Sequence, residues 1–268
     1  MPVLLAGKMA KTSFHIDKLN ISINGLEELC FLIYTYPLVA LDAVLSKELA
    51  QWIEESQLGG ELAAKLKEGF KTGDSPENML LYILQSTNYL TNAELRGFVQ
   101  EAVGIRRYSE SGLLRETGRM YYRLGLYQLA YAKLEESVSN LEEEIKHAKD
   151  ELELISKRNE KSDVLCDMVA VCMLRFDEVK AVKLLDLSEQ TGRFKRAEEY
   201  RYLITGEAFL SEEEKEALDI KRKRLETTVR EKRQCRKIKE LPAKDPVKLL
   251  KDAGEILCEW KKEYRKTG

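Results

Sequence analysis

The sequence predicts a mainly α-helical fold, a stack of antiparallel helical hairpins, and three observations support this prediction. Charged residues make up 34% of the 268 residues and only 5 are prolines, a composition more typical of long solvated helices than of sheets. After residue 25, apolar residues recur at the spacings of three and four that mark one face of a helix. Helix-start signals punctuate this pattern at short intervals, so we expect short helices joined by brief connections.

The composition also bounds the class of protein. With 44% apolar residues the chain can bury a substantial core, and a formal net charge of −2 provides no global attraction to nucleic acid or anionic membranes. The 5 cysteines form no Cys-x-x-Cys pair, which favours reduced, buried thiols. The apolar run near the N-terminus is too short for a signal peptide, and no stretch approaches the ~20 apolar residues of a membrane span. We therefore expect a soluble, cytoplasmic protein.

Residues 1–25 differ from the rest and are expected to form a small β-hairpin or an extended cap. Their apolar residues fall into the run Val3–Ala6 and a set spaced mostly by two, namely Phe14, Ile16, Ile21 and Ile23. Turn-prone Gly7 lies between the two groups, and Asn24-Gly25 follows the second. The Gly7-Lys8 pair lacks the rest of a phosphate-binding loop pattern, so we assign no phosphate site there.

Residues 26–110 form the expected N-terminal helical region. A first helix should end before Pro37, and Ser46 can cap the next. Gly59-Gly60 separates two expected helices, each with apolar residues along one face. Ser75-Pro76 places a cap residue before a proline at the first position of the next helix. Thr91 is followed three residues later by a glutamate, which is the spacing of a capping box.

Residues 114–137 contain two helices joined by a turn at Gly125. Gly118 and Ala130 are small enough for the two helices to approach closely, while Tyr121 fills the space beside them. This arrangement resembles a tetratricopeptide repeat (TPR), the 34-residue helix–turn–helix unit. In a frame that starts at Ser111, the matching residues are Gly118, Tyr121, Tyr122, Gly125, Tyr127, Ala130, Leu134 and Ser137.

Two further frames complete three TPR-like hairpins over residues 111–211. The frame from Glu178 repeats the pattern with Leu184, Gly192, Phe194 and Ala197. The frame from Ile145 retains the apolar pattern but no small residue, and it places the helix-breaking run Asn159–Asp163 at the expected turn. The resemblance implies an α-solenoid.

A heptad supports a different arrangement of residues 127–158. Apolar residues alternate at spacings of four and three from Leu134 to Ile155. If Ser139-Asn140 does not break the chain, this segment is one long helix, and its seam could join two copies in a homo-oligomer. Ser139 and Glu142 have capping-box spacing, so we expect two helices with the break there.

Residues 212–268 are expected to form a long charged helix and a C-terminal amphipathic helix. Ser211 and Glu214 make another capping box, and Pro242 and Pro246 end the helix that it opens. Residues 247–264 place their apolar side chains on one side, as a capping helix at the end of a solenoid requires.

The sequence offers no catalytic residue, cofactor site or metal site, so we expect a protein that is not an enzyme. Glu144 and His147 match half of a di-iron motif, but the second half is absent. Neither a Gly-x-Ser-x-Gly elbow nor a His-Glu-x-x-His helix occurs. Cys166 and Cys172 lie on an apolar helix, where structural thiols are expected.

The TPR resemblance implies a groove lined by the first helix of each pair. It points to partner contacts at Arg119, Tyr122, Arg123, Lys180 and Lys183. Each of these would also be an ordinary residue of a helix surface. The leading hypothesis is an intracellular scaffold or protein–protein interaction module that binds a partner protein or peptide in this groove.

The alternative hypothesis is a nucleic-acid-binding regulator that uses the basic stretch 221–239. The candidate patch consists of Lys221, Arg222, Lys223, Arg224, Arg230, Lys232, Arg233, Arg236 and Lys237. Aromatic residues for base stacking are missing from this stretch, and the acidic segment 142–153 could pair with it within the fold. A solvated or internally paired helix is therefore the simpler interpretation.

Overall fold

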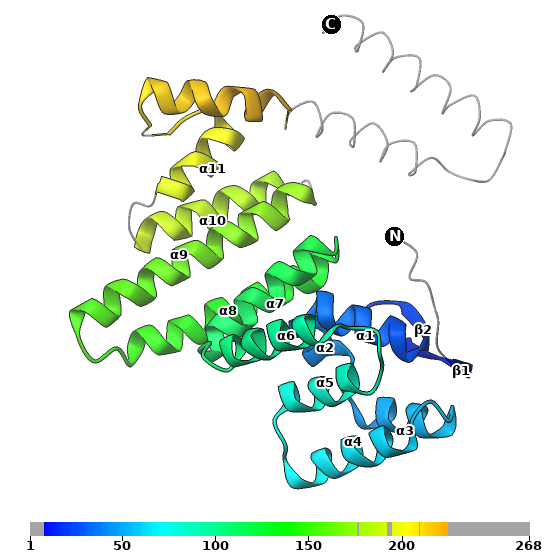
Figure 1. Ribbon diagram of the computed structural model, residues 1–268. Coiled ribbons are helices and arrows are strands. Elements are labelled where there is room, and N and C mark those ends of the chain that lie inside the picture. Colours follow the sequence, from blue (N-terminus) through cyan, green and yellow to red (C-terminus); the bar gives the residue numbers. More distant parts are fainter. Residues whose placement is uncertain (1–7, 176, 192–194, 209, 225–268) are drawn as a thin grey trace, which may run out of the picture.

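The computed structural model describes residues 8–175, 177–191, 195–208 and 210–224, and this part of the chain is mainly helical with a small N-terminal antiparallel hairpin (Figure 1). The elements are β1 (Met9–Ile16), β2 (Ile21–Gly25), α1 (Leu26–Thr35), α2 (Pro37–Ala43), α3 (Lys47–Glu55), α4 (Gly60–Thr72), α5 (Pro76–Gln85), α6 (Asn92–Ile105), α7 (Glu110–Arg123), α8 (Tyr127–Lys146), α9 (Glu151–Leu174), α10 (Glu178–Thr191) and α11 (Lys195–Thr205), followed by helical residues 212–224. Within the described residues, no helix is both long and apolar enough to cross a membrane.

The predicted N-terminal hairpin is confirmed, and turn-prone Gly7 lies outside the described residues. β1 and β2 pair antiparallel with Phe14 opposite Ile23, and the chain reverses at 17–20. Asn20 takes a positive φ of 52° there, a conformation that asparagine tolerates better than most residues. The turn therefore falls where the apolar alternation is interrupted, and the run Val3–Ala6 lies outside the described residues.

The hairpin is held on the helices by Trp52 of α3. The indole ring lies 5.5 Å from the Phe14 ring, centroid to centroid, and its Nε1 donates a hydrogen bond of 2.7 Å to the Thr12 carbonyl. Trp52 thus satisfies its own polar atom while it buries an apolar ring.

The predicted helix boundaries of residues 26–110 are confirmed where a local cap specifies them. α1 ends at Thr35, two residues before Pro37, and the Ser46 hydroxyl accepts a hydrogen bond from the backbone N–H of Leu49. At the start of α6, Thr91 and Glu94 form both hydrogen bonds of the capping box. These caps supply partners for N–H groups that the first helical turn leaves free.

The helical hairpin predicted from residues 114–137 is also confirmed, as α7 and α8. Gly125 turns the chain with a φ of 74°. A Cβ on Gly118 would lie 2.9 Å from Cγ of Leu134 and 3.2 Å from the carbonyl oxygen of Ala130, so the glycine is required by the close approach of the two helices. Deeper along the pair, the buried Ser137 hydroxyl donates to the Ser111 carbonyl at 2.8 Å.

Residues 127–158 form two helices, but the break at Ser139-Asn140 is wrong. Both residues lie inside α8, where the Ser139 hydroxyl donates to the carbonyl of Glu135 one turn earlier. The chain breaks at 147–150 instead, and Asp150 caps α9 by accepting from the N–H of Glu153. Leu141 is buried whereas Leu152 is 80% exposed, so the heptad does not form one continuous exposed seam.

The turn expected at Asn159–Asp163 is wrong as well, because α9 runs unbroken through these residues. α9 packs along α8 on one side and along α10 on the other, and α11 contacts both α9 and α10. The buried hydroxyls of Ser162 and Ser188 meet at 2.6 Å between α9 and α10. α10, the first helix of the frame from Glu178, therefore packs mainly against the helix that precedes it.

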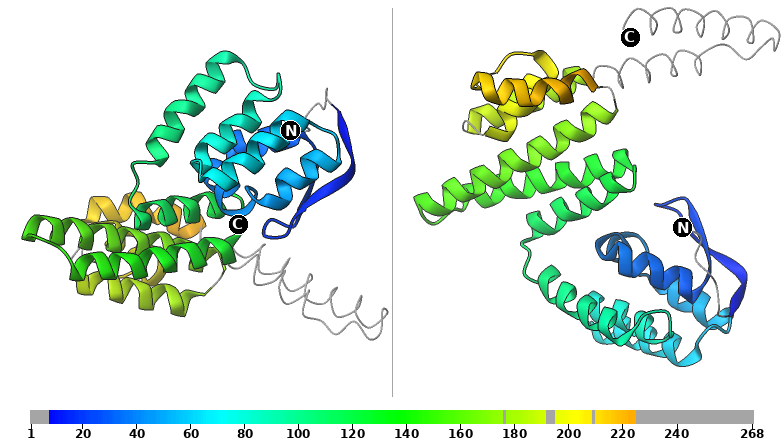
Figure 2. Two further views of the ribbon diagram at one scale, coloured as in Figure 1. Left: turned by 90° about the horizontal axis from the view of Figure 1, so that it is seen from below. Right: turned by 45° about the horizontal axis from the view of Figure 1, so that its top comes forward.

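The helices up to α6 and those from α7 onward form two groups, which Figure 2 shows from two sides. They meet where α2 packs against α7. Tyr121, fully buried on α7, donates its hydroxyl to Asp42 of α2 at 2.6 Å, and Lys18 and Lys133 each lie 3.2 Å from the same carboxylate. Burial opposes ionisation of Asp42, but the Tyr121 hydroxyl and the two lysines outweigh it and lower the pKa of the carboxyl.

Residues 212–224 pack back on α11. The capping box predicted at Ser211 and Glu214 is confirmed by both of its hydrogen bonds. Tyr202 of α11 donates its hydroxyl to Asp219 at 2.7 Å. The expected continuation of this helix and the amphipathic segment 247–264 lie outside the described residues.

A matched pair of glycine substitutions tests the close contact of α7 and α8. Gly118→Ala and Gly97→Ala both replace glycine within a helix, but a Cβ at Gly97 meets no atom within 4 Å among the described residues. Gly97→Ala should raise the free energy of unfolding by about 0.5–1 kcal/mol through helix propensity. The free energy of unfolding of Gly118→Ala should be about 2 kcal/mol lower than that of Gly97→Ala, because the added methyl group overpacks the contact between α7 and α8. Urea denaturation checks this, and equal effects at the two sites would contradict the close approach.

Candidate functional site

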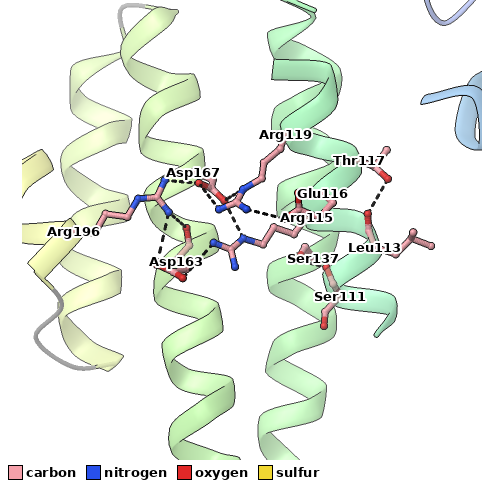
Figure 3. Close-up of polar contacts among 10 residues, drawn as sticks. All are labelled: Ser111, Leu113, Arg115, Glu116, Thr117, Arg119, Ser137, Asp163, Asp167 and Arg196. Atoms are coloured by element: carbon pink, nitrogen blue, oxygen red, sulfur yellow. Dashed lines mark hydrogen bonds and ion pairs between the residues drawn. The ribbon is translucent and has the colours of Figure 1, made fainter. Parts of the chain in front are cut away.

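A buried carboxylate, Asp167 of α9, lies at the centre of a cluster of arginines (Figure 3). Its Oδ2 accepts from Nε of Arg115 at 3.0 Å and from Nε of Arg119 at 2.9 Å, both on α7. Its Oδ1 accepts from Nη2 of Arg196, on α11, at 2.5 Å. One side chain thus joins three helices that are separated in the sequence.

Two further carboxylates surround this centre. Asp163, one turn before Asp167 on α9, lies 3.3 Å from Nη2 of Arg115 and 3.7 Å from Nη1 of Arg196. Glu116 accepts from Nη1 of Arg119 at 2.7 Å. Arg115, Arg119 and Arg196 are therefore each engaged by at least one carboxylate.

The electrostatics of Asp167 follow from this surrounding charge. Burial disfavours its ionised form, but Arg196 and Arg119 favour it more strongly, so the pKa of the carboxyl is lowered. Burial likewise opposes the charge on Arg196, and Asp167 overcomes it and raises the pKa of that guanidinium. Asp167 and Arg196 are therefore both charged at neutral pH.

The local sequence aligns these groups because of helical periodicity. Arg115, Arg119 and Arg123 follow one another at four-residue spacing along one face of α7. Asp163 and Asp167 share the same spacing on α9, as do Arg196 and Tyr200 on α11. Where the three faces meet, the arginines of the outer helices converge on the carboxylates of the central one.

A pocket of about 260 Å³ opens beside the cluster. It is lined by Arg119, Tyr122, Arg123, Leu134, Asp167, Ala170, Val171, Arg196 and Tyr200. Its volume is slightly below the roughly 300–1,000 Å³ of pockets that bury small-molecule ligands and cofactors. The pocket therefore fits one or two side chains better than a cofactor.

The tyrosines of the pocket are held in place by neighbouring groups. The Tyr122 ring lies 6.0 Å from the Tyr127 ring, centroid to centroid, and the guanidinium of Arg196 lies 5.6 Å from the Tyr200 ring centroid. Burial raises the pKa of Tyr122, with Tyr200 and Tyr127 adding to the effect, so its hydroxyl stays neutral. The pocket wall combines neutral aromatic rings with cationic groups.

The pocket brings together three of the predicted groove residues, Arg119, Tyr122 and Arg123. The other two, Lys180 and Lys183, belong to α10 and are not among the residues that line it. Nζ of Lys180 lies 3.9 Å from the Tyr131 ring centroid, and Lys183 is exposed.

Sequence reasoning missed the charged residues of the cluster other than Arg119, namely Arg115, Glu116, Asp163, Asp167 and Arg196. The four-residue spacing of Arg196 and Tyr200, and of the two aspartates on α9, was a usable signal for a shared helix face. It could not show which helices would face one another.

Only part of the predicted basic patch belongs to the described residues, namely Lys221, Arg222, Lys223 and Arg224. The guanidinium of Arg222 lies 5.6 Å from the Tyr202 ring centroid and packs against Gly206, where an added Cβ would overlap it. The remaining members, from Arg230 to Lys237, lie outside the described residues. The nucleic-acid hypothesis stays a prediction.

The described cysteines are poorly suited to nucleophilic chemistry. Cys30, Cys166 and Cys172 are free and buried, and burial raises the pKa of each thiol to about 11. Among the residues that the structure covers, no group of three or more histidine, cysteine, aspartate or glutamate side chains could hold a metal ion.

Comparison with known proteins yields no match to this chain, whether among protein-family models, curated proteins or solved structures.

Replacing Asp167 tests the cluster. Asp167→Asn leaves the guanidinium groups without their shared charge, and we expect a loss of about 2–3 kcal/mol in the free energy of unfolding. This is below the ~3–5 kcal/mol of fully buried pairs because Arg119 and Arg196 are one-third exposed. Asp163→Asn, at a half-exposed carboxylate, is the control and should cost less than about 1 kcal/mol.

The stability difference between wild type and Asp167→Asn should depend on pH. Because the folded-state pKa of Asp167 is lowered, its contribution is fully present above the ordinary value of 3.8 and is lost as pH falls through the folded-state pKa. Denaturant titrations between pH 2 and 7 should show the two proteins converging only in acid. A pH-independent difference would contradict an ionised Asp167.

Proposed function

We propose that this protein is a non-catalytic interaction module, a scaffold that holds a side chain of a partner protein or peptide in the pocket between α7, α9 and α11. The observation that carries the proposal is the convergence of Tyr122, Tyr200 and Arg123 around an open pocket, above a fixed cluster of charges. Tyrosine and arginine are the residues most often found at the energetic centres of protein interfaces.

Preorganisation supports the proposal. Arg119 and Arg196 approach Asp167 from opposite helices, which limits how far α7 and α11 can move apart from α9. A site held in its binding geometry before the partner arrives loses less conformational entropy on association. The charge cluster then serves as the support of the pocket, and the tyrosines serve as its contact surface.

The position of the pocket in the helix series agrees with a TPR-like solenoid. α7, α9 and α11 are alternate helices, and the helices between them, α8 and α10, pack beside them. In a TPR-like stack the first helices of successive pairs line the concave face. Under this proposal the pairs are α7–α8 and α9–α10, followed by α11 with residues 212–224, and α10 is the second helix of its pair rather than the first, as the frame from Glu178 had it.

We also place the protein in the cytoplasm. Cys30, Cys166 and Cys172 are unpaired thiols buried within the fold, as expected in a reducing compartment.

Filling the pocket tests the proposed function. Ala170 is half-buried on the pocket wall, so Ala170→Tyr should occupy the space of the partner side chain. Ser156→Tyr introduces the same residue at an exposed position of the same helix and is the control. Proteins retained from lysate by the immobilised wild type and variants are quantified by mass spectrometry, with melting temperatures as a check on folding.

We expect Ala170→Tyr to lose the proteins that wild type and Ser156→Tyr both retain, without a large change in melting temperature. Equal recovery by a folded Ala170→Tyr protein would show that partners do not use this pocket.

A further inference from the structure

Asp167 lines the pocket, and both oxygens of its carboxylate already accept hydrogen bonds within the fold. Oδ1 of Asp167 accepts from Arg196, and Oδ2 accepts from both Arg115 and Arg119. A cationic ligand would find this carboxylate already neutralised and would face the guanidinium groups around it. Asp167 is therefore not available to bind a basic side chain of a ligand.

Arg123 differs from the other arginines of the site. It is exposed at the C-terminal end of α7 and lines the pocket one turn beyond Arg119. Within the described part of the chain, it forms neither a hydrogen bond nor an ion pair, whereas Arg115, Arg119 and Arg196 pair with carboxylates. Its guanidinium presents its donors to whatever enters the pocket.

The arginines of the site outnumber its carboxylates by one, which corresponds to Arg123, unpaired among the residues that the structure describes. Four arginines, Arg115, Arg119, Arg123 and Arg196, face the three carboxylates of Glu116, Asp163 and Asp167. The site therefore carries one net positive charge, in a chain whose formal net charge is −2.

We infer that the pocket selects an acidic segment of its partner, with Arg123 as the residue that determines this specificity; this rests on the proposed function. The planar guanidinium can hold a carboxylate of an aspartate, a glutamate or a chain terminus through two parallel hydrogen bonds. A neighbouring apolar side chain of the same segment packs on Tyr122, Ala170 and Val171.

A peptide fits these observations better than a nucleic acid does. Nucleic-acid affinity comes chiefly from several phosphates neutralised together, and this pocket offers one unpaired arginine among the described residues. The half-buried Ala170, beside the fully buried Val171, gives the wall an apolar surface that suits an aliphatic or aromatic side chain. An acidic residue next to a bulky apolar one is the sequence feature that the pocket should select.

Selection from a phage-displayed library of random dodecapeptides tests this inference. Wild type should enrich peptides that carry aspartate or glutamate beside a bulky apolar residue. Arg123→Ala should bind the selected peptides at least about tenfold more weakly, as expected for the loss of a charge-assisted hydrogen bond. Arg123→Glu should instead enrich lysine and arginine, a reversal that loss of folding could not produce.

The matched control is Arg96→Ala, which removes an exposed arginine from α6 and should leave peptide binding unchanged. Fluorescence anisotropy of the selected peptide measures each affinity. A fluorescent single-stranded dodecanucleotide, measured in parallel, should show no binding that depends on Arg123.

The possible failures are distinguishable. Enriched peptides without acidic residues, or acidic peptides that bind Arg123→Ala as tightly as wild type, would overturn the role of Arg123 while Ala170→Tyr still abolished binding. Peptides that Ala170→Tyr binds normally, or no enrichment at all, would overturn both the specificity and the proposed function. Oligonucleotide binding that requires Arg123 would replace the acidic peptide with a phosphate ligand.

Discussion

The pairing of Asp167 with arginines from two neighbouring helices is the interaction on which the candidate site depends. A carboxylate this deeply buried is tolerated only while its partners stay in place, because an unpaired buried charge is far more costly than a paired one. Arg119 and Arg196 therefore fix the separations of α7, α9 and α11. The pocket beside them owes its shape to this electrostatic requirement as well as to apolar packing.

α7 links this site to the N-terminal half of the protein. On one side of the helix, Tyr121 is buried and hydrogen-bonded to Asp42 of α2; on another, Arg119 reaches Asp167. Gly118, which has no side chain, allows α8 to pack closely against the same helix. A shift of α2 would act on α7 and hence on the pocket, so the helices before α7 support a site to which they contribute no lining residue.

The structure agrees with sequence-based expectations where the determining interaction is local. The caps at Ser46 and Thr91 were predictable because a cap needs only residues three positions apart. Ser139 has the same spacing but lies within α8, since its hydroxyl can bond the carbonyl of the preceding turn as well as cap a new helix. The TPR resemblance led to three residues of the pocket, whereas Asp167 pairs with Arg119 across 48 residues and with Arg196 across 29, which no local pattern specifies.

Site-specific photo-crosslinking can show whether partners bind on the face shared by α7, α9 and α11. A photoreactive p-benzoylphenylalanine in place of Tyr122 lies in the pocket, and the same residue in place of Ser156 lies on the exposed part of α9. Irradiation in cells, followed by mass spectrometry of the adducts, should give a defined partner peptide from position 122 and none from position 156. Adducts that form equally at both positions, or only at position 156, would show that partners bind elsewhere on the protein.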